Sequence, residues 1–191
     1  MNLKNFKTDK SWTLFLDRDG VINRKIENSY VLKWDDFRFI DGVKEAFRIF
    51  KYHFDKIIVV TNQQCISKGL VAAVEIEFIH DKMIKEISEN GGRIDRIYFS
   101  PDVAGSDILN NSHEKVSRKP GTAMAFQALN DFPCIDFKKS VMVGDSYSDM
   151  LFGKRLGMTN VLIRGNKIYD PEIYEFVFQY YNNLKEFADD L

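Results

Sequence analysis

The chain has 191 residues, a formal net charge of -1 and 45% hydrophobic residues, which fits one folded domain with a buried core. This balanced charge gives no general attraction to nucleic acid or membranes, and no apolar stretch is long enough to span a bilayer. The two cysteines are too few for a disulfide framework or a four-cysteine zinc site. No signal-peptide core is visible near the N-terminus, so we expect a cytoplasmic protein, and we expect it to be a monomer.

The first predicted strand is the apolar run 12–16, and acidic residues follow it directly. Short aliphatic and aromatic runs that end in charge and glycine are typical of buried strands in parallel sheets. Along an extended chain Asp17 and Asp19 point to one side and Arg18 to the other, and Gly20 allows a sharp turn. Two adjacent carboxylates repel each other, so a cation must compensate them, most simply Mg²⁺. The alternative is a solvated turn at a strand end.

The rest of the chain alternates between helical and strand patterns. Helices are predicted from Gly42 onward, over 76–87, after Lys119, over 149–156 and after Asn183. Further strands are predicted over 56–60, 96–99, 140–143, 159–163 and 176–178. This alternation predicts a parallel sheet with right-handed crossovers.

Polar residues gather at the carboxyl ends of three predicted strands, where open parallel sheets bind ligands, and before one predicted helix. In chain order these groups are Asp17 to Val21, Thr61 to Gln63, Arg118 to Gly121, and Gly144 to Asp149. Taken singly, Thr61 fits a helix cap, Lys119 a solvated lysine and Asp145 a turn residue. Together and in this order the groups resemble the four motifs of the haloacid dehalogenase superfamily: nucleophile strand, hydroxyl strand, lysine and acidic metal loop.

The resemblance implies a Rossmann-like three-layer α/β/α sandwich of the α/β class, with a mostly parallel sheet. In this superfamily a cap is inserted after the first motif or between the second and third, and here ordinary sheet and helix patterns fill both intervals. We therefore expect a single domain over residues 1–191 without a large cap. A small flap is expected at 24–40 and a substrate-side loop at 101–117.

The resemblance also implies a mechanism for hydrolysing a phosphate monoester. Asp17 is expected to be the nucleophile that forms an aspartyl-phosphate. Asp19 is expected to protonate the leaving oxygen and later to activate water. Thr61 and Lys119 are expected to hold the transferring oxygens. Ion-pumping members of the superfamily carry threonine at the position of Asp19, so this acid indicates a phosphatase.

The expected cofactor is Mg²⁺, which prefers oxygen ligands. The resemblance assigns the ion to a carboxylate oxygen of Asp17, the backbone carbonyl of Asp19, and Asp145. Asp149 is expected to act less directly, through water or through Lys119.

The residues in and around the motifs are most similar to one branch of the superfamily. Residues 15–23, 37–43, 60–63 and 118–120 resemble the D-glycero-D-manno-heptose 1,7-bisphosphate phosphatases. The histidinol-phosphate phosphatases share this branch and are the alternative. A small phosphorylated substrate is expected to contact Arg18, Asn23, Asn28, Ser29, Tyr30, Asn62, Gln63 and Arg118. Arg118 is expected to recognise the second phosphate or the sugar; its alternative is a surface arginine in a weak ion pair.

One loop departs from this branch, whose members bind a structural zinc with a Cys-x-His pair and a Cys-x-Cys pair. The equivalent positions here are Ser100, Asp102, Lys115 and Ser117. These side chains cannot form a tetrahedral thiolate–imidazole site, so no zinc is expected. Gln64, Cys65 and Ser146 also differ from the residues usual in the branch, which leaves the identity of the substrate open.

An alternative from a different functional class is that the protein has a phosphatase fold without catalytic activity and binds a phosphosugar or a metal. Loss of a catalytic residue would indicate it, and Asp17, Asp19, Thr61, Lys119 and Asp145 are all present. No nucleic-acid or membrane partner is expected.

Overall fold

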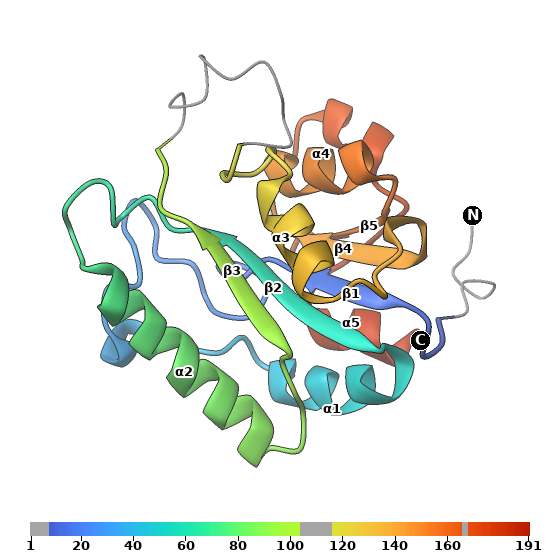
Figure 1. The fold of residues 1–191 in the computed structure, drawn as a ribbon, viewed down its shortest axis with the longest axis horizontal. Helices are drawn as coiled ribbons and strands as arrows, with labels where there is room; N and C mark the ends of the chain where they lie inside the picture. Colours follow the sequence, from blue (N-terminus) through green and yellow to red (C-terminus); the bar gives the residue numbers. More distant parts are fainter. Residues whose placement is uncertain (1–7, 104–115, 166–167) are drawn as a thin grey trace.

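The computed structural model describes residues 8–103, 116–165 and 168–191, and these form a parallel sheet flanked by helices (Figure 1). The sheet order is β3-β2-β1-β4-β5-β6, and every neighbouring pair is parallel. The strands are β1 (Thr13–Leu16), β2 (Lys56–Asn62), β3 (Arg96–Ser100), β4 (Ser140–Gly144), β5 (Thr159–Ile163) and β6 (Gln179–Tyr181). The predicted α/β architecture with a parallel sheet is confirmed.

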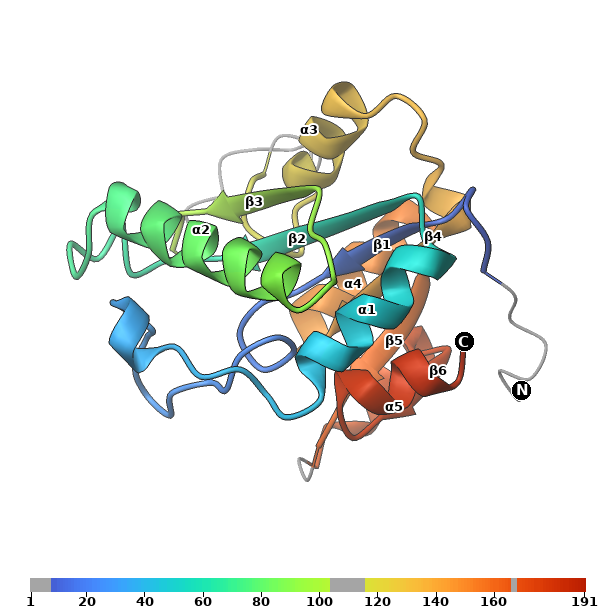
Figure 2. The same cartoon turned by 90° about the horizontal axis from the view of Figure 1, so that it is seen from below.

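Helices cover both faces of this sheet (Figure 2). They are α1 (Val43–His53), α2 (Ala73–Glu89), α3 (Ala123–Asp131), α4 (Tyr147–Leu156) and α5 (Leu184–Asp189). Buried residues of α1, α2 and α5 share one apolar cluster with Leu14 and Leu16 of β1. Buried residues of α3 and α4 share the opposite cluster with Phe15. The central strand is therefore buried on both faces, which explains its unbroken apolar sequence.

The last strand lies three residues later than predicted. The apolar residues Phe176 and Val177 were predicted to be strand, but Phe176 ends a 3-10 helix over Pro171–Phe176 and Val177 caps it. Both residues pack against the small cluster around Leu162. The edge strand that pairs with β5 is β6, and Tyr180 in it is 44% exposed. An edge strand with one exposed face needs few apolar residues. The strand was predicted at the more apolar segment 176–178, and this prediction was wrong.

The predicted flap and loop lie on the side of the sheet where the strands end. The flap 24–40 contains one 3-10 turn, Trp34–Asp36, and a β-bridge joins its far end at Phe39 to Asn23. Of the loop 101–117, residues 104–115 lie outside the described part, including Lys115. Among the described residues, no helix combines the length and the apolar character that a membrane crossing requires.

Hydroxyl and carboxylate groups join the two described ends of this loop. Ser100 Oγ lies 2.7 Å from Ser117 Oγ, and the Ser117 hydroxyl also donates to the Asp102 carboxylate. The backbone N–H of Asp102 donates to Ser100 Oγ over 3.2 Å. These three side chains are hard oxygen donors that pair with one another, and zinc sites of the structural kind use thiolates and imidazoles. That the protein holds no zinc stays a prediction.

Candidate active site

The carboxyl ends of β1, β2 and β4 meet at one cavity of about 870 Å³. Asp17 directly follows β1, and its N–H donates to the carbonyl of Val143 in β4 over 2.9 Å, so the chain is still anchored to the sheet at this residue. Asp145 follows β4, and Lys119 reaches the same place from the segment before α3. All three residues line the cavity, so parallel strand ends bring together residues far apart in sequence.

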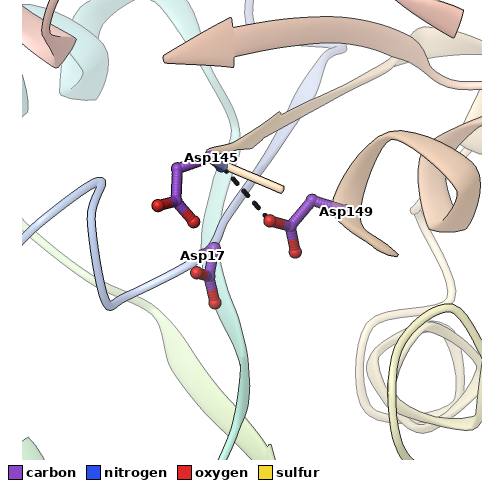
Figure 3. Close-up of side chains that lie close together, drawn as sticks. All are labelled: Asp17, Asp145 and Asp149. Atoms are coloured by element: carbon purple, nitrogen blue, oxygen red, sulfur yellow. Dashed lines mark hydrogen bonds between the residues drawn. The ribbon is translucent and has the colours of Figure 1, made fainter. Parts of the chain in front are cut away.

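Three carboxylates form the acidic part of the site (Figure 3). Asp17, Asp145 and Asp149 each offer an oxygen within 4.8 Å of the others, and all three residues are buried. Burial raises the pKa of Asp17 to about 7; Lys119 opposes this shift, and the charges of Asp149 and Asp145 add to it. Such a cluster is compensated by a cation.

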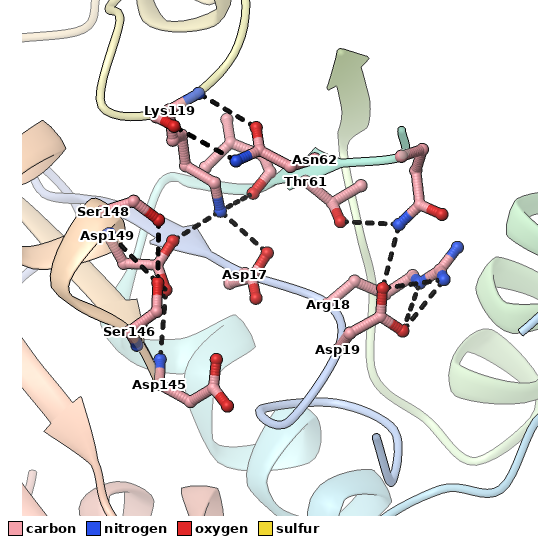
Figure 4. A network of polar contacts seen from close by, with 12 residues as sticks. Asp17, Arg18, Asp19, Thr61, Asn62, Lys119, Asp145, Ser146, Ser148 and Asp149 are labelled. Carbon is pink, nitrogen blue, oxygen red and sulfur yellow. Dashed lines mark hydrogen bonds and ion pairs between the residues drawn. The ribbon is translucent and has the colours of Figure 1, made fainter. Parts of the chain in front are cut away.

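Lys119 supplies one positive charge to this cluster (Figure 4). Its ammonium lies 2.7 Å from Asp17 Oδ1, 2.6 Å from Asp149 Oδ1 and 2.6 Å from the carbonyl of Val60. Burial alone would lower the pKa of Lys119, but Asp149 and Asp17 outweigh burial and hold the pKa above its ordinary value. Asn62 fixes the backbone of Lys119 reciprocally: its Oδ1 accepts from the N–H and its Nδ2 donates to the carbonyl.

The residues around Asp145 fit a divalent cation with oxygen ligands. Gly20 has φ +95°, and a Cβ at this position would lie 2.2 Å from Asp145 Oδ2, so only glycine leaves room for the carboxylate. The ammonium of Lys25, from the flap, lies 3.2 Å from both Asp145 oxygens. The Asp145 carboxylate thus already attracts a cationic side chain, and the donor atoms around it are oxygens, the ligands that Mg²⁺ prefers.

Asp149 has both carboxylate oxygens engaged by the protein. Its Oδ1 pairs with Lys119, and its Oδ2 accepts from the N–H groups of Asp145 and Ser146 and from the Ser146 hydroxyl. The Ser146 hydroxyl lies 2.6 Å away and caps the start of α4. Asp149 thus holds the loop and the lysine, and its indirect role toward the metal stays a prediction.

The predicted substrate contacts divide into two groups. The residues on the cavity wall are Asn28, Ser29, Tyr30, Asn62 and Arg118, together with Thr61. Arg18, Asn23 and Gln63 are 0%, 0% and 2% exposed, and they do not line the cavity. Their side chains surround the carboxylate of Asp19 instead, and Figure 4 shows Arg18 beside it. The structure therefore gives no support to substrate contacts through these three side chains, because they are covered by protein.

Two residues of this region were not predicted as part of the site: Arg164, which lines the cavity, and Tyr169, which contacts Asp145. Arg164 follows β5, lines the cavity and stacks its guanidinium on Tyr180, 4.3 Å from the ring centroid. Arg164 directly follows the predicted strand 159–163, so its position at a strand end, like those of Asp17 and Asp145, could have identified it from the sequence. The hydroxyl of Tyr169 donates to the carbonyl of Asp145 over 2.7 Å, and no pattern in the sequence signals this contact.

The titration of Asp17 gives a prediction about stability. A folded-state pKa of about 7 means that folded protein keeps a proton which unfolded protein has lost above about pH 4. Without metal, stability from this group is therefore present at low pH and is lost as pH rises through 7. Mg²⁺ favours the ionised carboxylate, so we expect it to raise the Tm more at about pH 8 than at about pH 5.5. Thermal unfolding with Mg²⁺ or with chelator measures this, and equal stabilisation at both pH values would contradict it.

Comparison with known proteins agrees with the motif order. The family model of HAD-hydrolase-like proteins matches residues 116–188. A D-glycero-alpha-D-manno-heptose-1,7-bisphosphate 7-phosphatase of Campylobacter jejuni is 33% identical over 177 residues, covering 93% of this chain and 94% of that protein. The chain belongs to the haloacid dehalogenase superfamily. The D-glycero-beta-D-manno-heptose-1,7-bisphosphate 7-phosphatase of Vibrio cholerae is 37% identical over 155 residues, covering 81% of this chain and 82% of that protein.

Solved structures of the superfamily share the fold. A D,D-heptose 1,7-bisphosphate phosphatase from B. bronchiseptica, solved with magnesium and phosphate, superposes with a TM-score of 0.76 at 22% identity. The match covers 93% of this chain and 96% of that chain. Within the superfamily the chain groups with phosphatases, and it is a hydrolytic enzyme of that kind.

Proposed function

We propose that the chain is a Mg²⁺-dependent phosphomonoester hydrolase that acts through an aspartyl-phosphate on Asp17. The proposed substrate is D-glycero-D-manno-heptose 1,7-bisphosphate, cleaved at the 7-phosphate. One observation supports the chemistry above all: a buried lysine bridges Asp17 and Asp149 beside a third carboxylate, at the wall of an open cavity. A nucleophile, a cation beside it and a place for a second cation are what phosphoryl transfer needs.

The residues of the chain divide the reaction between them. Asp17 attacks phosphorus, and the bond to the leaving oxygen breaks while Asp19 gives that oxygen a proton. Lys119 and the Thr61 hydroxyl hold the transferring oxygens. Water then cleaves the aspartyl-phosphate, releases phosphate and gives its proton to Asp19. A Mg²⁺ ion held by Asp17, Asp145 and the Asp19 carbonyl would neutralise charge on these groups.

The proposed substrate fits the charges around the cavity. Arg24, Lys25, Arg118 and Arg164 line it in addition to Lys119, so a second phosphate outside the reacting centre would meet positive charge. The names of the relatives from Campylobacter jejuni and Vibrio cholerae point to the same substrate. Arg118 is the residue proposed to hold the second phosphate, because a guanidinium binds phosphate with two parallel hydrogen bonds.

The test compares kcat/KM for heptose 1,7-bisphosphate, fructose 1,6-bisphosphate and histidinol phosphate, with Mg²⁺ and with chelator. We expect the heptose bisphosphate to be preferred and chelation to abolish turnover. Arg118→Lys should lower kcat/KM for the bisphosphate more than for a monophosphate, by about tenfold or more. Its matched control is Arg48→Lys on the exposed face of α1. A preference for histidinol phosphate would favour the other member of the branch, and binding of phosphosugar without turnover would favour the non-catalytic alternative.

A further inference from the structure

The carboxylate of Asp19 is held from three directions by residues of the chain. Arg18 Nη2 lies 2.9 Å from both carboxylate oxygens, and Arg18 Nε lies 3.2 Å from Oδ1. Asn23 Nδ2 donates to Oδ1 and Gln63 Nε2 donates to Oδ2, each over 2.9 Å. Asp19 itself lines the cavity, and its side chain is 23% exposed. The group assigned to proton transfer is thus anchored on its protein side and open on the other. The charge of Arg18 and these hydrogen bonds also favour its ionised form and, against burial, lower the pKa of Asp19 below its ordinary value.

Arg18 has no contact with solvent, and its side chain ends inside the protein. The residue is 0% exposed, and a buried guanidinium is stable only when its charge and its donors are paired. Two of its nitrogens serve Asp19, and the third, Nη1, lies 3.1 Å from Nε2 of His80. Arginine can only donate, so Nε2 of His80 accepts and the ring proton is on Nδ1.

His80 extends on α2 toward this guanidinium and is held there by packing. It is 4% exposed and lies within the apolar stripe of the helix, next to Ile79 and close to Met83. Its ring meets that of Phe99 in β3 edge-on, with the centroids 5.5 Å apart. Burial, and then the charge of Arg18, lower the pKa of His80 to about 3, so the ring stays neutral and remains an acceptor at ordinary pH.

We propose that Arg18 and His80 are positioning residues for Asp19: His80 fixes the guanidinium of Arg18, and Arg18 fixes the carboxylate that transfers the proton. The inference rests on the proposed hydrolase function. Neither residue lines the cavity, so neither touches the substrate, and both act through Asp19. Gln63 extends the same network, because its Nε2 also lies 2.9 Å from the Thr61 hydroxyl. The network links the acid to the hydroxyl that holds the transferring oxygens.

A positioning role and a merely structural role differ in how the reaction depends on the leaving group. Nitrophenolate departs easily without a proton, whereas phenolate is more basic and departs more easily when an acid protonates it. p-Nitrophenyl phosphate and phenyl phosphate have nearly the same size. A loosened Asp19 should therefore slow phenyl phosphate more, while a general loss of folded protein should slow both alike.

The experiment uses the full chain with Mg²⁺ and measures kcat/KM for both aryl phosphates, which reports the steps up to release of the leaving group. In His80→Phe, which keeps a ring against Phe99 but has no acceptor, the ratio of kcat/KM for phenyl to p-nitrophenyl phosphate should fall about tenfold. His80→Gln restores an acceptor near Nε2 and should recover most of the ratio. Met83→Leu, on the same buried face of α2, is the matched control and should leave the ratio unchanged.

Arg18→Lys is an independent second variant, because it keeps the charge but loses the link between His80 and Asp19; it should shift the ratio in the same direction. Thermal unfolding of each variant gives the folded fraction, so a His80→Phe protein that does not fold leaves Arg18→Lys and His80→Gln to decide. An active wild-type enzyme with the same ratio in every folded variant would overturn the inference alone. A wild-type protein that hydrolyses neither ester would overturn the proposed function and the inference together.

Discussion

Asp17→Asn is expected to lower kcat by at least about 10⁴-fold, because an amide oxygen is a poor nucleophile and no other carboxylate of the site directly follows β1. The variant should also be more stable than the wild-type protein at about pH 8 without metal. The reason is the raised pKa of Asp17: burial and the neighbouring carboxylates oppose its charge, and asparagine removes that charge. Loss of activity together with a gain in Tm separates loss of the nucleophile from loss of folding.

The measurements are steady-state phosphate release and thermal unfolding in chelator. Asp189→Asn is the matched control, since this carboxylate has a 53% exposed side chain and pairs with Lys185 on α5, and neither residue lines the cavity. It should change neither activity nor Tm appreciably. Near-normal turnover by the Asp17→Asn variant would rule out the aspartyl-phosphate mechanism, whatever its stability.

The sequence predicts the parts of this site that depend on strand ends. β1, β2 and β4 are buried on both faces, so their apolar runs are visible without a structure, and the polar residue after each run must lie at the same edge of the sheet. That is why Asp17, Thr61 and Asp145 could be placed together. β6 was misplaced because an edge strand with an exposed face lacks that apolar run.

The contacts that depend on packing between distant elements could not be predicted. Arg18 was expected to point away from Asp17 and Asp19, because side chains alternate along an extended chain. Its long side chain instead bends back to the Asp19 carboxylate inside the protein. The position of His80 beside it follows from how α2 packs on the sheet. Similarly, Lys25 reaches Asp145 only because the flap folds back over the end of β4. Periodicity fixes which face of a helix is buried and leaves open which partner a buried polar residue meets.

Lys119→Met is expected to affect stability and activity together. The ammonium side chain is 1% exposed and pairs with both Asp17 and Asp149, so its removal leaves two carboxylates buried without their cation. Breaking a buried ion pair by removing one partner costs about 3–5 kcal/mol. Without Lys119 to oppose burial, the pKa of Asp17 rises further, so the nucleophile is protonated at neutral pH and turnover falls by about 10³-fold or more.

The pH dependence of this loss identifies its cause. At about pH 5.5 Asp17 is protonated in the folded wild-type protein, so removing its partner should cost less stability there than at about pH 8. Mg²⁺ should recover part of the lost Tm at the higher pH, because it supplies positive charge to the same carboxylates. Lys138→Met, at an exposed position, is the matched control. A loss of stability that is equal at both pH values and unaffected by Mg²⁺ would show that Lys119 serves packing of the loop and not the charge of the cluster.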